Sequence, residues 1–221
     1  MASGVSAVSN FLKTKLEIFS GRNDIEVFYN IIEPTALTES NSTLETTNIL
    51  IVADLVDEIK NISGVINAFS QVVKDHPNLN LRIVGGGKDN SMLASLAEQK
   101  GLLNKSIYFE GRKTNQEVYT YIKQSDFLVM NSRFETFSLI CAEALICGKP
   151  VVATACGGPQ EFITEACGLL IPPDDEKALE VAIRKMVVDH RNYDRKFLSD
   201  YATKHFSPEG VGQRFAEWLG R

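Results

Sequence analysis

Two glutamates of this chain, Glu135 and Glu143, stand eight positions apart around the start of an almost wholly apolar segment. Residues 139–147 read Leu-Ile-Cys-Ala-Glu-Ala-Leu-Ile-Cys, which predicts a helix that is apolar all round and therefore buried. Glu143 lies in its middle, with no basic residue within a helical turn. Because an unpaired buried carboxylate is strongly destabilising or takes up a proton, Glu143 needs a partner. A ligand hydroxyl or a backbone turn elsewhere in the fold could supply it.

The segments around this helix predict where Glu135 lies. Residues 126–130 read as a buried strand and residues 148–153 as a turn into another, so the unit is strand, loop, helix, turn, strand. Glu135 falls in the loop at the carboxyl edge of a parallel sheet, where ligands bind. The loop also supplies the amides of Phe137, Ser138 and Leu139. Unsatisfied amides at a helix start suit a phosphate, which would repel Glu135, so we expect Glu135 to contact a neutral group rich in hydroxyls.

The rest of the chain repeats the β–α unit, and its 221 residues suffice for one α/β domain. Strands are predicted at 48–53, 79–84 and 106–110, and helices at 62–73, 92–101, 115–124, 176–188, 192–204 and 208–219. Alternating strands and helices predict a doubly wound, mainly parallel sheet of the Rossmann-like kind. The Ser-, Thr- and Asn-rich stretch 39–47 is expected to be an exposed linker.

Composition excludes several classes of function. A net charge of -5 without a Lys/Arg cluster argues against a nucleic-acid-binding surface. The sequence has no apolar run of transmembrane length and no signal peptide, so we expect a cytoplasmic protein. Its four cysteines form no C-x-x-C pair and are expected to be core residues in a reducing compartment, with no metal site. A dinucleotide-dependent oxidoreductase is a weak alternative, because Asn90 stands where the third glycine of G-x-G-x-x-G would follow Gly85.

The two glutamates and the segments around them resemble a known family, the retaining, nucleotide-sugar-dependent glycosyltransferases of the group 1 type (family 4), which have the GT-B fold. The resemblance begins with the E-x7-E spacing of Glu135 and Glu143. It continues, in the right order, through residues 81–87, 107–112, 143–145, 147–153, 157–161 and 168–171. It covers nearly the whole chain, which makes it more specific than any single motif.

The resemblance implies that the chain is the C-terminal, donor-binding domain of a GT-B enzyme, excised from its N-terminal acceptor domain. Residues 1–47 would be a leader helix and interdomain linker, residues 48–205 the nucleotide-sugar-binding domain, and residues 206–221 a helix that crosses back. Apolar stripes are expected at Val5, Val8, Phe11, Leu12, Leu16 and Phe19 in the leader, and at Val211, Phe215, Trp218 and Leu219 in the last helix. Without their partner domain these stripes should dimerise the chain or fold back on it, leaving little transferase activity.

The resemblance also implies roles for individual residues. Glu135 and Lys60 would carry the reaction, Glu135 at the donor sugar and Lys60 at the diphosphate leaving group. The donor would further be bound by Glu143 at the ribose, by the amides of Phe137, Ser138 and Leu139, by Arg112 near the base, and by Gly85 and Gly86. We expect Lys60 at a helix start, where a cation opposes the dipole, and this local disadvantage favours a functional role. The sequence has no D-x-D triplet, and neither a metal nor a cofactor is expected.

The implied reaction transfers a sugar from a UDP- or GDP-linked donor to an acceptor hydroxyl with retention, in glycan or surface polysaccharide synthesis. The acceptor domain could add a peripheral contact with the inner face of the membrane. One departure matters: Ala53-Asp54 stands where the family usually has Gly-Arg, so another cation such as Arg133 substitutes, the phosphates sit differently, or activity is weakened. The alternatives are a non-catalytic module that binds nucleotide sugar or a protein, and a nucleotide-sugar 2-epimerase.

Overall fold

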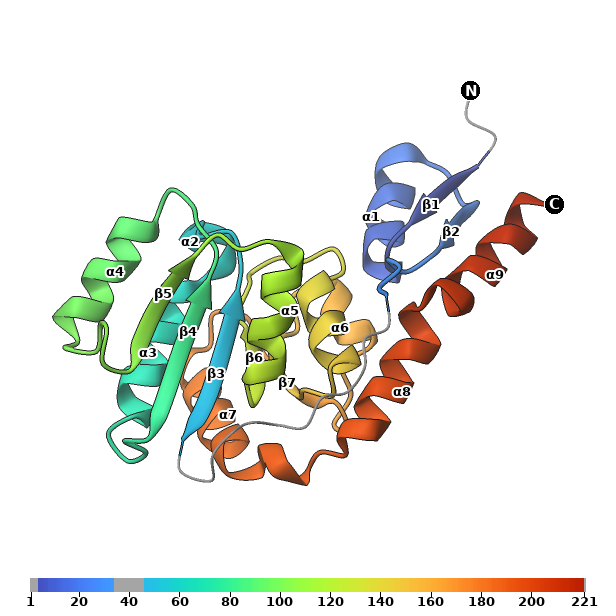
Figure 1. Ribbon diagram of the computed structural model, residues 1–221. Helices are drawn as coiled ribbons and strands as arrows, with labels where there is room; N and C mark the ends of the chain where they lie inside the picture. The colour runs from blue at the N-terminus through green and yellow to red at the C-terminus, as the bar shows by residue number, and fades with distance from the viewer. Residues whose placement is uncertain (1–3, 34–45, 221) are drawn as a thin grey trace.

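A six-stranded parallel sheet forms the body of the molecule in a computed structural model, which describes residues 4–33 and 46–220 (Figure 1). The strand order is β5-β4-β3-β6-β7-β8, and every neighbouring pair is parallel. The strands are β3 (Thr47–Val52), β4 (Leu79–Val84), β5 (Ile107–Gly111), β6 (Phe127–Met130), β7 (Val151–Thr154) and β8 (Gly168–Ile171). The predicted doubly wound α/β fold is confirmed. From β3 the chain adds β4 and β5 on one side, and it then returns to the other side of β3 to add β6, β7 and β8. The topological switch point therefore lies between β3 and β6.

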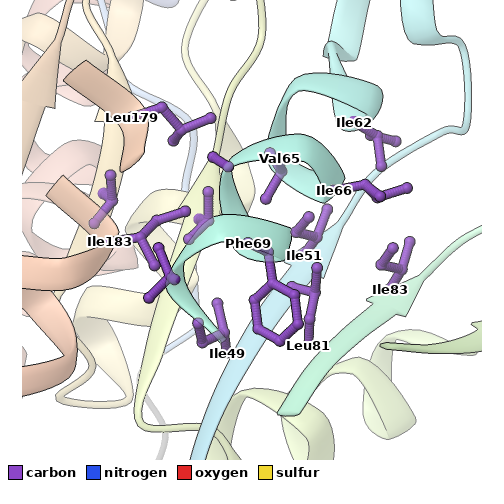
Figure 2. Packing of buried hydrophobic residues seen from close by; sticks show 14 of the residues in the cluster. Ile49, Ile51, Ile62, Val65, Ile66, Phe69, Leu81, Ile83, Leu179 and Ile183 are labelled. Atoms are coloured by element: carbon purple, nitrogen blue, oxygen red, sulfur yellow. The ribbon is translucent and has the colours of Figure 1, made fainter. Parts of the chain in front are cut away.

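Helices cover both faces of the sheet because the strands are apolar on both sides. The helices are α2 (Asp57–Lys60), α3 (Ile62–Val72), α4 (Asn90–Gln99), α5 (Asn115–Gln124), α6 (Leu139–Ile146), α7 (Glu176–Asp189), α8 (Arg195–Phe206) and α9 (Pro208–Leu219), with 3₁₀ turns η1 (Gly158–Glu161) and η2 (His190–Asn192). Successive residues of β3 point to opposite faces. Ile49 and Ile51 pack with α3 and α7, whereas Leu50 packs with α6 and α8. Figure 2 shows the first face, with Phe69 of α3 lying over Ile49 and Leu81 of the sheet.

The predicted boundaries differ most where side chains cap helices. The helix expected at 192–204 begins at Arg195, because Asp194 accepts bonds from the amides of Lys196 and Phe197 (2.9 and 3.0 Å) and so fixes the first turn. The preceding residues form η2 instead. Of the linker expected at 39–47, residues 39–45 lie outside the described residues, and Thr47 already belongs to β3.

The leader is more than the single helix that the sequence predicted. Val5 lies in a short strand, β1 (Val5–Ala7), which pairs in parallel with β2 (Ile25–Val27), and α1 (Asn10–Ser20) connects them. The predicted helical stripe therefore loses both Val5 and Val8, which precede the helix. Ser9 sets the start of α1, because its hydroxyl accepts a bond from the amide of Leu12 (3.0 Å).

The leader contacts the body at both of its ends. Glu161 of η1 accepts bonds from the amides of Asn10 and Phe11 (2.9 and 2.6 Å) and from the Asn10 side chain (2.9 Å), at the positive end of the α1 dipole. The ring of Phe28 meets Phe215 and Trp218 of α9, with centroids 5.2 and 5.4 Å away. These contacts are the folding back that the sequence offered as one alternative. The far side of α1 leaves Ile18 and Phe19 77% and 90% exposed, and dimerisation through it stays a prediction.

Replacing Glu161 by Gln should loosen the first turn of α1 without unfolding the sheet. The charge-assisted bonds to the Asn10 and Phe11 amides would become ordinary ones, which are about half as strong. We expect hydrogen exchange at these amides to accelerate about tenfold, while the amides of β3 keep their protection. Glu165→Gln, which removes the same charge from an exposed position, is the matched control. Equal protection of α1 in both variants would contradict a capping role.

Candidate functional site

A cavity of about 240 Å³ opens at the carboxyl ends of β3 and β6, at the switch point of the sheet. Its polar lining comes from three elements: Lys60 from α2, Asn131, Ser132 and Glu135 from the loop after β6, and Ser138 from the start of α6. The structure thus brings together Lys60, Glu135, Ser138 and Leu139, four of the residues predicted from the sequence. A wider depression of about 540 Å³ near η2 and α8 contains none of the predicted residues.

An ion pair lies in this cavity. Lys60 Nζ donates to Glu135 Oε1 at 2.6 Å, and Ser132 Oγ donates to the same oxygen at 2.8 Å. The pair is partly shielded from water, with 25% of the Lys60 and 16% of the Glu135 side chain exposed. Two backbone contacts fix the loop: the Arg133 amide donates to the carbonyl of Ile59 (2.7 Å), and the Glu135 amide donates to the carbonyl of Cys156 (3.2 Å).

Lys60 lies between two helices. It directly precedes Asn61, the N-cap of α3, which begins at Ile62 as predicted. It is also the last residue of the four-residue helix α2, which the sequence did not predict and where a cation complements the helix dipole. Asn61 separates the two helices in the left-handed conformation (φ 45°). Because the dipoles of α2 and α3 act on Lys60 in opposite senses, the argument for a functional role rests on its place in the cavity.

The start of α6 is strained. Ser138 has φ 74° and ψ 80°, and a left-handed conformation in a residue other than glycine costs about 1–3 kcal/mol, which is tolerated most often at functional sites. The Ser138 side chain caps no amide and lies 3.3 Å from Cys141 Sγ instead. The first amides of α6, at Leu139 and Ile140, therefore stay uncapped beside the cavity. These amides and Lys60 together form a ready site for a phosphate.

Phe137 contributes no side chain to the cavity. Its ring is buried among Tyr29, Phe162 and Phe206, with centroids 5.6, 5.2 and 5.4 Å away. Only its backbone remains available for the role predicted from the sequence. This aromatic cluster instead anchors the loop before α6 against α8.

Glu143 carries a second, partly buried carboxyl group. It lies on α6 but does not line the 240 Å³ cavity, and it faces Tyr119 of α5, whose phenol pKa is raised by burial and then by the Glu143 charge. Burial raises the pKa of Glu143 itself to about 7. Within residues 4–33 and 46–220 its carboxylate has no ion pair and no hydrogen bond. The apolar helix predicted a fully buried carboxyl that needs a partner; Glu143 is partly buried, and a ligand hydroxyl stays a prediction for that partner.

The glycines in the loop after β4 allow this loop to pack closely against the loop after β3. A Cβ on Gly85, which has φ +140°, would lie 1.8 Å from the carbonyl oxygen of Ala53, and one on Gly87 would lie 2.4 Å from that of Leu55. Only glycine permits this approach. Arg112 donates to the carbonyl of Gly86 (3.0 Å), and its guanidinium lies 3.7 Å from the Asp54 carboxylate.

Asp54, which stands at the position of the family arginine, is therefore paired with Arg112 at an exposed rim, outside the cavity. The other cation considered, Arg133, is bound elsewhere. Its Nε donates to Asp174 at 2.6 Å, and its Nη1 donates to the carbonyls of Asp57 and Glu58 at 2.8 and 2.9 Å. Arg133 thus ties the loop after β6 to α2 and does not replace the arginine as a free cation.

Sequence reasoning missed two residues of the site, Ser132 and Asn131. Ser132 fixes the Glu135 carboxylate, and Asn131 donates to the carbonyl of Asn61 (3.0 Å) just after Lys60. Both follow β6 directly, so their place at the carboxyl edge was the signal that could have found them.

The cysteines are buried, as predicted: Cys141, Cys147, Cys156 and Cys167. Burial raises the pKa of Cys141 to about 12 and that of Cys147 to about 11, so both thiols stay protonated at neutral pH. Over the described residues, no group of His, Cys, Asp and Glu side chains is arranged to hold a metal ion. None of the helices in the same residues is long and apolar enough to cross a bilayer.

A doubly wound parallel sheet with uncapped helix-start amides and a lysine at its switch point defines an α/β domain of the nucleotide-binding type. The family profile described as "Glycosyl transferases group 1" matches residues 35–205. The chain therefore belongs to the group 1 glycosyltransferases.

Two curated relatives illustrate the family. The chain is 29% identical over 137 residues to a GDP-mannose-dependent monoacylated alpha-(1-6)-phosphatidylinositol monomannoside mannosyltransferase of Corynebacterium glutamicum, covering 59% of this chain and 35% of the relative. It is 28% identical over 168 residues to an N-acetyl-alpha-D-glucosaminyl L-malate synthase of Bacillus anthracis, covering 72% and 43%. The chain thus spans less than half the length of either relative.

Solved structures share the fold across the whole chain. HepE of Anabaena, in complex with UDP and glucose, superposes with a TM-score of 0.87 at 22% identity, covering 100% of this chain and 63% of that one. Sucrose-phosphate synthase of Thermosynechococcus elongatus gives a TM-score of 0.86 at 22% identity, covering 99% and 58%. At this identity the likeness shows the fold, that of the GT-B glycosyltransferases.

Proposed function

We propose that this chain is the donor-binding half of a retaining glycosyltransferase that takes a sugar from a nucleoside-diphosphate sugar. The observation that carries the proposal is the placement of Lys60 and the α6 amides in one cavity at the switch point. The named relatives and the UDP-bound neighbour support the same class of donor. A second lobe would supply the acceptor and the other wall of the cleft, and the product would belong to a glycan or surface polysaccharide.

The size of the cavity suggests how a donor lies. A volume of about 240 Å³ is smaller than the roughly 300–1,000 Å³ typical of sites that enclose a whole small molecule. It has room for the sugar and the phosphates, with Glu135 near the sugar hydroxyls and Lys60 near the diphosphate. The nucleoside would then lie outside it, along α6 toward Glu143, whose ionised carboxylate can accept bonds from both ribose hydroxyls.

The chain should bind nucleoside diphosphates on its own. Because this domain would supply one wall of the proposed cleft, we expect dissociation constants between about 0.1 and 1 mM for UDP or GDP. Calorimetry and ligand-observed NMR with UDP, GDP and their sugar conjugates measure this, and AMP serves as a monophosphate control. A folded protein that binds none of these nucleotides would refute the proposal.

A non-catalytic binding module is the second candidate, and one observation favours it: the rim carries the Asp54–Arg112 pair where an unpaired cation would help a leaving diphosphate. Turnover separates the two candidates. An enzyme containing both lobes should release UDP or GDP from a panel of nucleotide sugars in the presence of an acceptor. Binding without release would support the module instead.

A further inference from the structure

The cation of the candidate site is already neutralised by the protein itself. Among the described residues that line the cavity, Lys60 is the one that carries a positive charge, and its ammonium group is bound to Glu135 at 2.6 Å. The bond is not a loose surface contact. Ser132 fixes the accepting oxygen from a second side, and the loop that bears Glu135 is bridged to Gly157 and Gly158 by backbone contacts.

A diphosphate that enters this site must therefore exchange partners with the protein. To bond with Lys60, its oxygens must take the place of the Glu135 carboxylate or share the ammonium group with it. Either exchange gives up part of the charge-assisted bond between Lys60 and Glu135. The loss of such a bond weakens binding by about tenfold or more.

Displacing Glu135 from Lys60 should weaken binding less for the nucleotide-sugar donor than for the nucleoside diphosphate that remains after transfer. A bound sugar offers hydroxyl groups that donate to the displaced Glu135 carboxylate, so its charge stays satisfied. After transfer the hydroxyl groups of the sugar are gone, and the carboxylate faces the diphosphate with the Ser132 hydroxyl as its remaining donor. The same carboxylate should therefore disfavour the product more than the substrate.

We propose that Glu135 is a built-in competitor for Lys60, which keeps the affinity for the nucleoside-diphosphate product low and drives its release. The inference rests on the proposed function and adds a role for the ion pair within it. Glu135 then serves two steps: it holds the sugar of the donor, and it recovers Lys60 when the diphosphate leaves.

The test compares UDP with UDP-glucose, and GDP with GDP-mannose, by calorimetry on the wild-type chain and on Glu135→Gln. Glutamine keeps the shape and can still accept the Ser132 hydroxyl bond, but it carries no charge. We expect the variant to bind the free diphosphate about tenfold more tightly and the nucleotide sugar no more tightly than the wild type. Glu135→Ala should give the same tightening for the diphosphate, which guards against a special property of the glutamine side chain.

Two further variants show whether the tighter diphosphate binding of Glu135→Gln depends on Lys60. If Glu135 acts by competing for Lys60, the tightening should shrink to less than about threefold when Glu135→Gln is made in a Lys60→Ala background. A tightening that persists in full there would mean direct repulsion alone and would overturn the proposal. Glu58→Gln is the matched control, because it removes the same charge from the neighbouring helix α2 at a side chain that is 84% exposed. It should change the affinity by less than about twofold.

The outcomes separate this inference from the proposed function. If the wild-type chain binds no nucleotide, the proposed function fails. If the wild type binds UDP or GDP but Glu135→Gln binds them equally or more weakly, the competition is refuted while the proposed function stands.

Discussion

Replacing Glu143 by Gln should make the ligand-free protein more stable and its nucleotide-sugar complex weaker. The two effects have one cause. Burial disfavours the charge of this carboxyl and raises its pKa to about 7, while the ionised form is the one that can accept two hydroxyl bonds from a ribose. A residue that destabilises the empty protein and stabilises the complex is one retained for the ligand.

The direction of the pH effect follows from the raised pKa. Below the ordinary glutamate pKa of 4.5 the carboxyl is protonated in the folded and unfolded chains alike, and its burial does not change the free energy of unfolding. Between 4.5 and about 7 the folded state holds the proton that the unfolded state has lost, so stability falls as pH rises. Above about 7 the destabilisation is complete. Allowing for partial contact with water, Glu143→Gln should raise the free energy of unfolding by about 2 kcal/mol at pH 8 and leave it unchanged near pH 4.

Binding should show the opposite dependence. For the wild type, affinity for UDP-glucose should rise as pH increases through about 7, because the Glu143 carboxylate, which we propose receives the ribose, becomes ionised. UDP-glucose is the proper probe, since its diphosphate has no ionisation in this range. Glu143→Gln should bind it about tenfold more weakly at pH 8, with no dependence on pH. Glu98→Gln, an exposed acid of α4, is the control. Equal affinities for all three proteins would make Glu143 a structural residue.

The sheet and the carboxyl edge could be predicted from the sequence because they depend on local patterns. The continuous apolar runs that became β6 and β7 are typical of strands buried on both faces. The helix between them was expected to be buried all round, but Leu139 is 49% exposed and Glu143 is only partly buried, because this side of α6 borders the open carboxyl edge. The place of the loop that carries Glu135 could also be predicted, since a parallel unit presents this loop at the carboxyl edge.

Contacts between distant segments could not be predicted in this way. Lys60 and Glu135 are 75 residues apart and share a hydrogen bond. Their pairing depends on how the loops after β3 and β6 meet, for which the sequence carries no periodic signal. The four-residue helix α2 is likewise too short to leave a pattern, and its end at Lys60 opposes the dipole of α3 on which the sequence argument depended. The pairing of Asp54 with Arg112 likewise depends on how the loops after β3 and β5 meet, which no local pattern predicts.

Lys60→Ala in an enzyme that contains both lobes should lower kcat by about 10²–10³ while raising the dissociation constant of the nucleotide sugar by less than tenfold. The two effects should differ because the charge on the diphosphate grows as the bond to the sugar breaks. In the ground state Lys60 exchanges one anionic partner, Glu135, for another, so its net contribution to binding is small. In the transition state the leaving group carries an additional charge, and Lys60 is placed to stabilise it in a partly buried site.

Lys60→Arg is the matched variant that separates charge from shape. Arginine retains the positive charge, so it should recover part of kcat, but its planar fork differs from a compact ammonium group and the recovery should be incomplete. Single-turnover and steady-state measurements together show whether the chemical step has slowed. Because Glu135→Gln also weakens the contact with the donor sugar, Lys60→Ala/Glu135→Gln should restore neither donor affinity nor kcat. A loss confined to donor affinity, with kcat unchanged, would place Lys60 in ground-state binding and not in departure of the diphosphate.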